Sequence, residues 1–227
     1  MTSFSIGLSL LSSNKQKKSH SKKTLSEEAR RILFLLDGSQ QQDNVLMKDE
    51  NGRPYFSDLH ADFSISHSVD TCAVSMVTGK NLHTGCDIEL ARPRVNAREI
   101  AEKFFSAQER DYSFSTDSKA GFYTIWTLKE CFLKLRGLSV FDMHNTPSFI
   151  CDKGHFAFGS EVLSPLSFYV YELQGKSGEI YLLSAAIEGV KDLRPEIRWF
   201  SQSPLPVRII VEIKAALNPT ETVSPKR

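Results

Sequence analysis

The apolar residues of the chain follow two different periods, which separate predicted strands from predicted helices. Apolar spacing typical of a helix follows Ser26 and recurs over residues 122–136, and a glycine, Gly38 or Gly137, comes directly after each segment. Runs with the alternation or the β-branched and aromatic content of strands occupy residues 6–11, two segments within 62–78, and residues 86–90, 156–158, 166–173, 179–187 and 208–213. This mixed order of strands and helices predicts an α+β fold.

The chain is expected to divide into two halves that each combine strands and helix. A predicted turn at residues 81–84 marks the break between them. We therefore expect one half over residues 1–83, a second over residues 84–200 and an extension over residues 201–227. The chain has 227 residues, which is enough for each half to bury a core.

Composition and charge exclude several classes of protein. Hydrophobic residues make up 41% and charged residues 24% of the sequence, which are ordinary values for a globular protein. The formal net charge of +1 argues against a general nucleic-acid binder, because such domains carry a large positive excess. No run of 18 apolar residues predicts a membrane helix, and residues 4–11 are too short and serine-rich for a secretory signal. We expect a cytoplasmic protein with free cysteines, since the four cysteines form no CxxC pair.

Two carboxylates are predicted to lie side by side on one strand. Asp87 and Glu89 alternate with the apolar residues Cys86, Ile88 and Leu90, so both point to the same face. Their Cβ atoms should be roughly 6 to 7 Å apart, a span that one hard cation such as magnesium can bridge. The missing side chain of the neighbouring Gly85 would let a ligand approach. An ordinary solvated strand face would show the same pattern.

The predicted helix over residues 122–136 carries three charged residues of interest. Lys129 falls within the apolar face of this helix, and Glu130 and Lys134 lie one turn apart on its flank. A lysine at the edge of a core needs an anion, which either a ligand phosphate or a protein carboxylate can supply. The alternative is an ordinary surface pair of Glu130 and Lys134 beside a snorkelling Lys129. Together with Asp87 and Glu89, these residues match what displacement at a pyrophosphate requires: carboxylates for magnesium and cations for phosphate oxygens.

Five short motifs then make a family resemblance specific. In order, they are NGRP at residues 51–54, FSISHS at 63–68, TGCDIE at 84–89, FFS at 104–106 and WTLKECFLK at 126–134. In order and spacing they resemble the 4'-phosphopantetheinyl transferase superfamily, in particular its larger, monomeric Sfp type. The resemblance covers about residues 50 to 190.

The resemblance implies a fold, a reaction and partners. The fold would be a monomeric pseudo-dimer of two similar α+β halves, with coenzyme A in the cleft between a nucleotide-side first half and a second half that holds magnesium. The reaction would transfer the 4'-phosphopantetheine group of coenzyme A to a serine of an apo acyl or peptidyl carrier protein and release 3',5'-ADP. Such carriers serve fatty-acid, polyketide and non-ribosomal peptide synthesis, and neither nucleic acid nor membrane is implied as a partner.

The resemblance also implies roles for individual residues. Magnesium would be held by Asp87, Glu89 and Glu130, and Glu130 would also be the general base toward the carrier serine, directly or through water. The ligands of the coenzyme A phosphates would be Lys129 and Lys134 at the pyrophosphate and Arg53, Ser66 and His67 at the 3'-phosphate. The segment before residue 51 is shorter than is usual for the Sfp type, and Lys22 and Lys23 are candidates for its missing nucleotide contact.

Two other functions use the same residues. A magnesium-dependent phosphohydrolase would employ the three carboxylates to activate water, and a catalytically silent relative would only bind coenzyme A or a carrier protein. The intact set of Asp87, Glu89, Glu130 and Lys134 argues against the silent relative. A basic stretch comprising Arg92, Arg94, Arg98 and Lys103 offers a docking edge for an acidic carrier protein.

Overall fold

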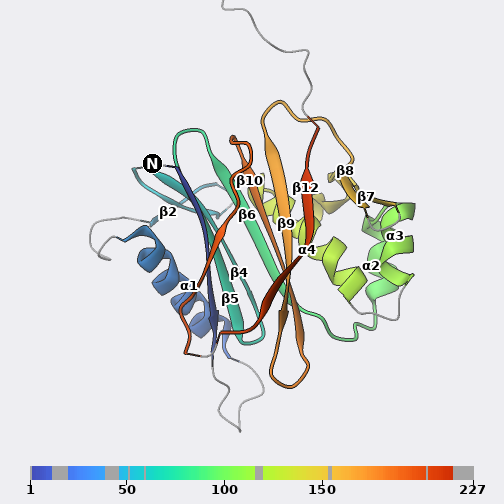
Figure 1. The fold of residues 1–227 in the computed structure, drawn as a ribbon, viewed down its shortest axis with the longest axis horizontal. Coiled ribbons are helices and arrows are strands. Elements are labelled where there is room, and N and C mark those ends of the chain that lie inside the picture. The colour runs from blue at the N-terminus through green and yellow to red at the C-terminus, as the bar shows by residue number, and fades with distance from the viewer. Residues whose placement is uncertain are drawn as a thin grey trace, which may run out of the picture.

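Two four-stranded sheets and the helices that cover them form the structure. The computed structural model describes residues 2–11, 20–38, 46–50, 52–58, 60–115, 120–152, 155–202 and 204–216. Asn51 of the first motif lies outside the described residues. The sheets stand next to each other in the centre of the molecule, with α1 on one side and the other helices on the opposite side (Figure 1).

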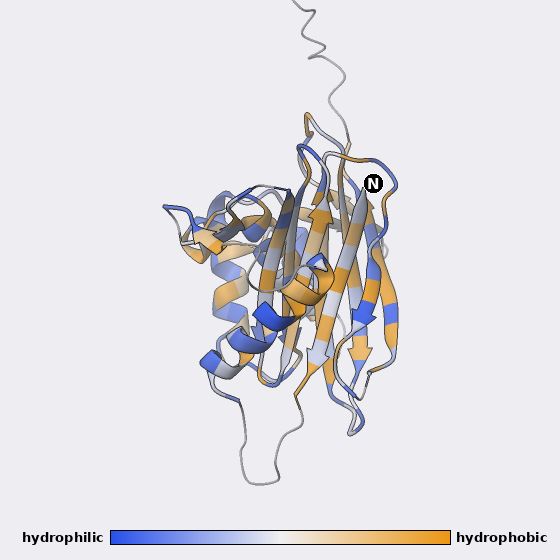
Figure 2. Ribbon diagram, turned by 90° about the vertical axis from the view of Figure 1, so that its left-hand side faces the viewer, coloured by the Kyte–Doolittle hydropathy of each residue, from blue (hydrophilic) through white to orange (hydrophobic). Residues whose placement is uncertain are grey.

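The first sheet contains the strands of the N-terminal half. Its order is β11 (Glu196–Trp199), β1 (Ser3–Leu10), β5 (Thr71–Thr78) and β4 (Ala61–Ser68). Helix α1 (Lys22–Asp37) packs its apolar face on this sheet, with Ile32 and Leu33 in one core cluster with Phe63 and Val74. Figure 2 shows α1 in front of the strands, with hydrophilic residues along its outer side. A small hairpin of β2 (Leu46–Lys48) and β3 (Pro54–Phe56) follows α1 in the chain.

The second sheet has the order β12 (Val207–Lys214), β9 (Leu166–Gln174), β10 (Ile180–Glu188) and β6 (His83–Leu90). Helix α4 (Ala120–Leu135) packs against it and is buried along most of its length. The remaining elements of this half are α2 (Ala97–Phe104), α3 (Ala107–Phe114), the 3-10 helix η1 (Val140–Asn145), and the hairpin of β7 (Phe149–Asp152) and β8 (His155–Phe158).

The two halves repeat one order of connections. In each half the first strand, β1 or β6, pairs antiparallel with the last strand, β5 or β10. That last strand pairs with the middle strand, β4 or β9, and the long helix α1 or α4 lies between the first and middle strands in the chain. The α+β prediction is confirmed, and the elements β1, α1, β4 and β5 share one order of connections with β6, α4, β9 and β10.

The structure differs from the expected boundaries at three places. Helix α1 is capped by Ser21, whose Oγ accepts a hydrogen bond from the Thr24 amide at 3.1 Å, so Ser26 lies inside the helix rather than at its start. Strand β11 belongs to the segment assigned to the second half, yet it pairs in parallel with β1 of the first sheet. Strand β12 falls in the expected extension but completes the second sheet beside β9. Both strands pair with the edge of a sheet formed by strands earlier in the sequence, β11 with β1 and β12 with β9.

Side chains of β4 join the two sheets by binding the backbone of β6. The Ile88 amide donates to Ser66 Oγ at 3.2 Å, and the Leu90 amide donates to Ser68 Oγ at 3.1 Å. Both strands are edge strands of their sheets, so these hydroxyl groups satisfy amides that a further strand would otherwise bind. We call this junction the seam.

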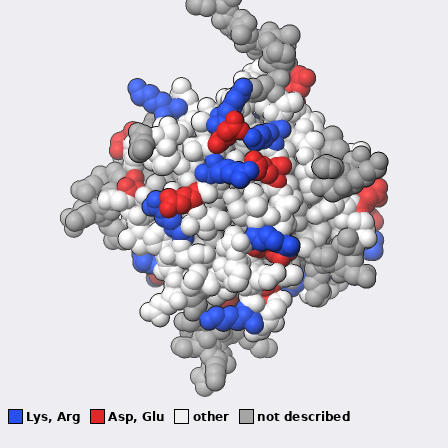
Figure 3. Space-filling model, viewed as in Figure 1, with Lys and Arg blue, Asp and Glu red and all other residues white. Residues whose placement is uncertain are grey.

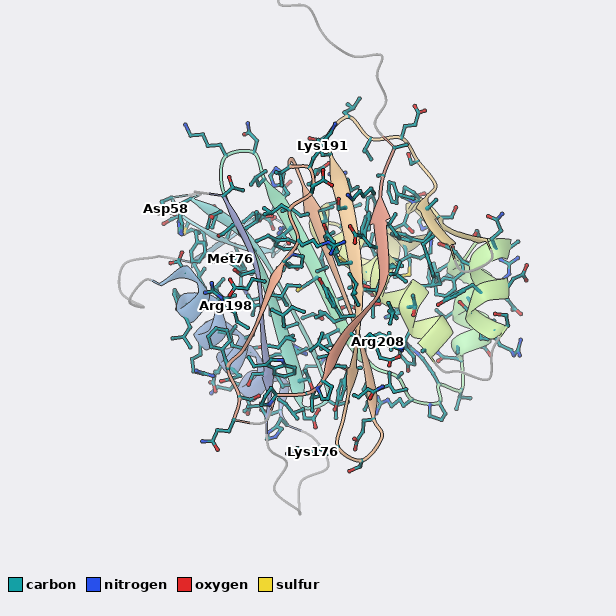
Figure 4. All side chains as sticks on the ribbon, viewed as in Figure 1. Asp58, Met76, Lys176, Lys191, Arg198 and Arg208 are labelled. Carbon is teal, nitrogen blue, oxygen red and sulfur yellow. The ribbon has the colours of Figure 1, made fainter. Side chains whose placement is uncertain are left out.

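The face of the molecule seen in Figure 1 is mostly uncharged, and the few basic and acidic side chains on it lie close to one another (Figure 3). The ion pairs Arg194 with Glu212 and Arg208 with Glu172 join residues of the second sheet and of the segment before β11. Figure 4 labels Arg208 on β12 and Lys176 at the tip of the hairpin between β9 and β10. Among the described residues no helix is both long and apolar enough to cross a membrane. The described cysteines Cys72, Cys86 and Cys131 are free and buried, as expected.

Gly85 on β6 allows close packing of α4, which differs from the ligand approach expected from the sequence. A Cβ atom at Gly85 would lie 2.3 Å from the Cys131 carbonyl oxygen and 2.8 Å from the Leu135 amide nitrogen. Both are backbone atoms of α4, which a side chain cannot displace without moving the helix. The glycine is therefore required by helix packing on the strand.

Gly85→Ala should destabilise the protein by about 1 to 3 kcal/mol or more, because the added methyl group overpacks the contact with α4. Urea denaturation measures this loss. Gly7→Ala is a matched control on β1, since its Cβ would meet only the side chains of Ile32, Leu36 and Phe200, and we expect a smaller loss. Equal stability of the Gly85 variant and the parent would contradict the packing assignment.

Candidate functional site

A cleft of about 690 Å³ opens between the two halves of the protein. Its first wall carries the basic residues Lys22 and Arg30 from α1 and Lys48 from β2. Its second wall carries three acidic residues and one lysine, which are Asp87 and Glu89 from β6 and Glu130 and Lys134 from α4. The cleft therefore brings together a basic wall and an acidic wall from segments that are distant in the sequence.

Asp87 is the most buried of the three carboxylates. It is 5% exposed, and its Oδ1 accepts hydrogen bonds from Ser66 Oγ at 2.8 Å and from Lys134 Nζ at 2.7 Å. Its Oδ2 is buried and has no hydrogen-bond partner among the described residues. Glu89 Oε2 accepts a hydrogen bond from Ser68 Oγ at 2.7 Å. The strand alternation predicted from the sequence thus places both carboxylates on the cleft side of β6.

Burial and mutual repulsion change the titration of the acidic wall. Burial, with a further contribution from the charge of Asp87, raises the pKa of Glu130 to about 7. The same two causes raise the pKa of Glu89. Burial alone would lower the pKa of Lys134, but the negative charge and hydrogen bond of Asp87, together with contributions from Cys86 and Glu130, outweigh it, and the net shift is upward. The lysine thus stays protonated beside carboxylates that repel one another.

The acidic wall has the chemistry of a site for a hard divalent cation. Its three carboxylates offer oxygen ligands, and the unpartnered Asp87 Oδ2 is an acceptor that a cation would satisfy. Within the described residues, no group of three His, Cys, Asp or Glu side chains is close enough to form a metal site as it stands. The ammonium group of Lys134 lies on Asp87 and supplies the positive charge there. The residues fit magnesium, although their present geometry is not that of a ligand set.

Two of the residues expected at the 3'-phosphate, Ser66 and His67, lie on β4 at the cleft. His67 is half-buried and lines the cleft. Ser66 also lines it, but its hydroxyl group is engaged by Asp87, Lys134 and the Ile88 amide. Ser66 is therefore part of the hydrogen-bond network of the acidic wall. His67 lines the cleft without taking part in the hydrogen bonds described for the seam.

Arg53 does not lie where the sequence placed it. Its Nη2 donates to the Asp62 carboxylate at 2.9 and 3.0 Å, and its Nη1 donates to the Lys134 carbonyl oxygen at 2.8 Å. The residue lines a neighbouring cavity of about 370 Å³ instead of the cleft. Protein acceptors bind the guanidinium group in this structure, which differs from the expected position of a 3'-phosphate ligand in the cleft.

Lys129 is a second correction. Its side chain is 2% exposed and forms an ion pair with Glu109, which is fully buried, at 3.2 Å, and its Nζ also donates to Thr146 Oγ1 at 3.1 Å. Glu109 accepts hydrogen bonds from the Ser106 amide at 2.6 Å and the Phe149 amide at 2.7 Å. Of the two anions that the sequence allowed for Lys129, the protein carboxylate is the one it meets. Lys129 is not among the residues that line the cleft.

Helix α1 separates the two lysines that were expected together. Lys22 lines the cleft, whereas Lys23 is 86% exposed and lies 3.9 Å from Glu27 on the outer side. Sequence reasoning missed Arg30, which lines the cleft with Lys22 and Ser26. The signal was present, because a spacing of four residues puts positions 22, 26 and 30 on one face of a helix. Lys48 offered no such signal, since a single lysine in a short strand has no pattern.

Comparison with known proteins gives one family. The family model of the 4'-phosphopantetheinyl transferase superfamily matches residues 83–180. The chain is 36% identical over 103 residues to the 4'-phosphopantetheinyl transferase AcpT of Salmonella typhimurium, which covers 44% of this chain and 53% of that protein. It is 34% identical over 103 residues to AcpT of Escherichia coli, covering 44% and 52%. It is 32% identical over 100 residues to the 4'-phosphopantetheinyl transferase psf-1 of Bacillus pumilus, covering 42% and 41%. The chain spans about half the length of the curated relatives it matches.

Lys129→Met should lower the free energy of unfolding by about 3 to 5 kcal/mol, because it leaves the buried Glu109 without its cation. Adding Glu109→Gln should recover part of the loss, which a double-mutant cycle in urea measures. As the control, Lys23→Met removes an exposed pair and should change stability by less than about 0.5 kcal/mol. If the Lys129 variant is as stable as the parent, the structural role of the ion pair with Glu109 is contradicted, and Lys129 is again a candidate for a phosphate contact.

The raised pKa of Glu130 predicts a pH dependence of the stability of the metal-free protein. Between its ordinary value of 4.5 and about 7, the unfolded chain has lost the Glu130 proton while the folded chain keeps it. Stability therefore falls as pH rises through this window. Glu130→Gln, measured with a chelator present, should be about 1 to 3 kcal/mol more stable than the parent at pH 8 and equally stable near pH 4.5.

Glu89 contributes in the same direction, so the slope should shrink in the Glu130 variant without vanishing. Glu27→Gln replaces an exposed carboxylate on α1 and is the control, with no expected change in the slope. A parent and a Glu130 variant with parallel curves would show that this carboxylate titrates normally.

Proposed function

We propose that this chain, which belongs to the 4'-phosphopantetheinyl transferase superfamily, transfers the 4'-phosphopantetheine group of coenzyme A to a serine of an apo carrier protein. The observation that carries the proposal is the cleft whose lining combines three basic residues of the first half with three carboxylates of the second. A pyrophosphate ester needs both, because its oxygens require positive charge while magnesium requires carboxylates.

The acidic wall is proposed to hold magnesium through Asp87, Glu89 and Glu130. A bound magnesium ion would offset negative charge on the pyrophosphate during transfer of the phosphopantetheine group from coenzyme A to the carrier serine. The oxygen donors of the wall and the buried, unpartnered Asp87 Oδ2 support this assignment. Lys134 is proposed to contact a phosphate oxygen from its place beside Asp87, since it is 30% exposed and lines the cleft.

The basic wall is proposed to bind the nucleotide end of coenzyme A. Lys22, Arg30 and Lys48 lie on α1 and β2 and supply three cations for phosphate groups, and His67 on β4 lines the same cleft. Ser66 is engaged with Asp87 and Lys134 in the absence of ligand, so any contact it makes to the nucleotide requires those bonds to rearrange.

In the proposed reaction, the serine oxygen of the carrier attacks the β-phosphorus of coenzyme A. The new bond between phosphorus and serine oxygen forms as the bond from phosphorus to the bridging oxygen breaks, and 3',5'-ADP leaves with that oxygen. The serine proton passes to Glu130, directly or through water. The pKa of Glu130 near 7 supports this role, because a carboxylate with such a pKa can accept a proton and return it near neutral pH.

An acidic acyl or peptidyl carrier protein is the proposed partner. The exposed basic residues Arg92, Arg94, Arg98 and Lys103 lie along the chain directly after β6 and on α2. Arg94 lies 5.0 Å from the ring centre of Trp126, which itself lines the cleft. The basic edge thus reaches the mouth of the cleft, where a carrier serine would have to enter.

The decisive experiment incubates the protein with coenzyme A, magnesium and a panel of apo carrier proteins. A carrier that gains the mass of one phosphopantetheine group supports the transferase. Release of free phosphopantetheine without a modified carrier would instead identify the magnesium-dependent phosphohydrolase, and binding without any change would identify the silent relative.

Asp87→Ala, Glu89→Ala and Glu130→Ala should each reduce turnover by at least about a hundredfold, because each loses a carboxylate from the acidic wall. Circular dichroism checks that the variants fold. Glu161→Ala, which removes an exposed carboxylate from a loop, is the control and should retain full turnover. A Glu89 variant as active as the parent at limiting magnesium would contradict the metal assignment.

A further inference from the structure

The guanidinium group of Arg53 connects four segments of the chain. Nη1 donates to the carbonyl oxygens of Lys134 and Leu135, at 2.8 and 3.3 Å. Nη2 donates to the Asp62 carboxylate, and it also reaches the carbonyl oxygens of Phe63 and Thr84, at 3.3 and 3.2 Å. Arg53 is thereby bound to the C-terminal turn of α4 and to both strands of the seam.

The contact with α4 adds side-chain donors at the end of the helix, where the Lys134 carbonyl oxygen also accepts the Gly137 amide at 3.2 Å. The last four carbonyl groups of a helix have no partner within it, and a cation near them also interacts favourably with the helix dipole. Lys134 is held at two ends in this way, because Arg53 binds its carbonyl oxygen while Asp87 binds its ammonium group. Glu130 lies one turn earlier on the same helix and faces the same cleft.

Asp62 extends this connection into β6. Its Oδ2 accepts a hydrogen bond from the Thr84 amide at 2.8 Å, while the same carboxylate receives Arg53 Nη2. Thr84 stands three residues before Asp87 on the strand that carries the acidic wall. The pair of Arg53 and Asp62 thus fixes α4 and β6 against each other at the end of the seam.

The four terminal N–H groups of Arg53 all point at protein acceptors, so the residue has little capacity left for a ligand phosphate. We propose that Arg53 is a positioning residue, which holds the last turn of α4 and thereby sets Lys134 and Glu130 in the cleft. The inference rests on the proposed function for its effect on turnover, but its structural part is independent of that function.

Arg53→Lys keeps the charge and removes the fork that reaches two carbonyl groups and a carboxylate at once. With coenzyme A, kcat should fall roughly ten- to a hundredfold while KM stays within about twofold, because misplaced catalytic groups slow the reaction without removing a contact to the cofactor. The preference for coenzyme A over dephospho-coenzyme A, which lacks the 3'-phosphate, should be unchanged. Hydrogen exchange of the amides at residues 132–136 should become about tenfold faster.

Three variants accompany this one. Asp62→Asn should give the same pattern, and its effect should not add to that of Arg53→Lys, since both break one contact. Arg136→Lys is the matched control, because this arginine at the same helix end binds Glu188 at the surface, and neither turnover nor exchange should change. His67 lines the cleft. His67→Ala should therefore weaken the preference for coenzyme A over dephospho-coenzyme A, whereas Arg53→Lys should leave this preference unchanged.

A higher KM for coenzyme A in Arg53→Lys, together with a lost preference over dephospho-coenzyme A and unchanged exchange, would overturn the inference and make Arg53 a phosphate ligand. If the parent transfers nothing to any carrier, the proposed function fails. The exchange measurement still decides on Arg53 in that case, because faster exchange at residues 132–136 supports the positioning role and unchanged exchange overturns it.

Discussion

The seam between β4 and β6 is the contact on which the rest of the site depends. Ser66 and Ser68 each bind both the backbone and a carboxylate of β6 there, and Ser66 also accepts a hydrogen bond from Lys134. The Ser66 hydroxyl accepts a hydrogen bond from the Ile88 amide and donates one to Asp87. The Ser68 hydroxyl accepts a hydrogen bond from the Leu90 amide and donates one to Glu89. The same oxygen atoms therefore join the two sheets and orient the acidic wall. Because a hydroxyl is both donor and acceptor, serine can do this where an apolar residue could not.

The position of α4 follows from the seam through backbone contact. At Gly85 the helix lies directly on β6, with its Cys131 carbonyl oxygen where a Cβ atom would be. Two charged contacts then fix the helix along its length, the buried pair of Lys129 with Glu109 and the contact of Arg53 with the last turn. Glu130 and Lys134 lie between these anchors on the side that faces the cleft. A strand and a helix that are separate in the sequence thereby hold one acidic wall.

Local patterns were enough to predict the parts of the site that lie within one element. Alternation on a strand placed Asp87 and Glu89 on one face. The partners of Arg53 and Lys129 could not be predicted in this way, because they come from residues far along the chain and depend on tertiary packing. The return of β11 to β1 has the same cause, since a sheet edge is open to any strand that reaches it.

The distribution of charge explains why neither half forms the site alone. The second half supplies Asp87, Glu89 and Glu130 to the cleft beside the cation Lys134, and burial, with a further contribution from the charge of Asp87, raises the pKa values of Glu89 and Glu130. The first half supplies positive charge with Lys22, Arg30 and Lys48. A ligand that combines phosphate groups with a divalent cation would offset both, because its anionic end meets the basic wall and its cation meets the carboxylates. The charges that line the cleft are therefore complementary to those of such a ligand. Because the ligand would contact both halves, its binding should also stabilise them against separation.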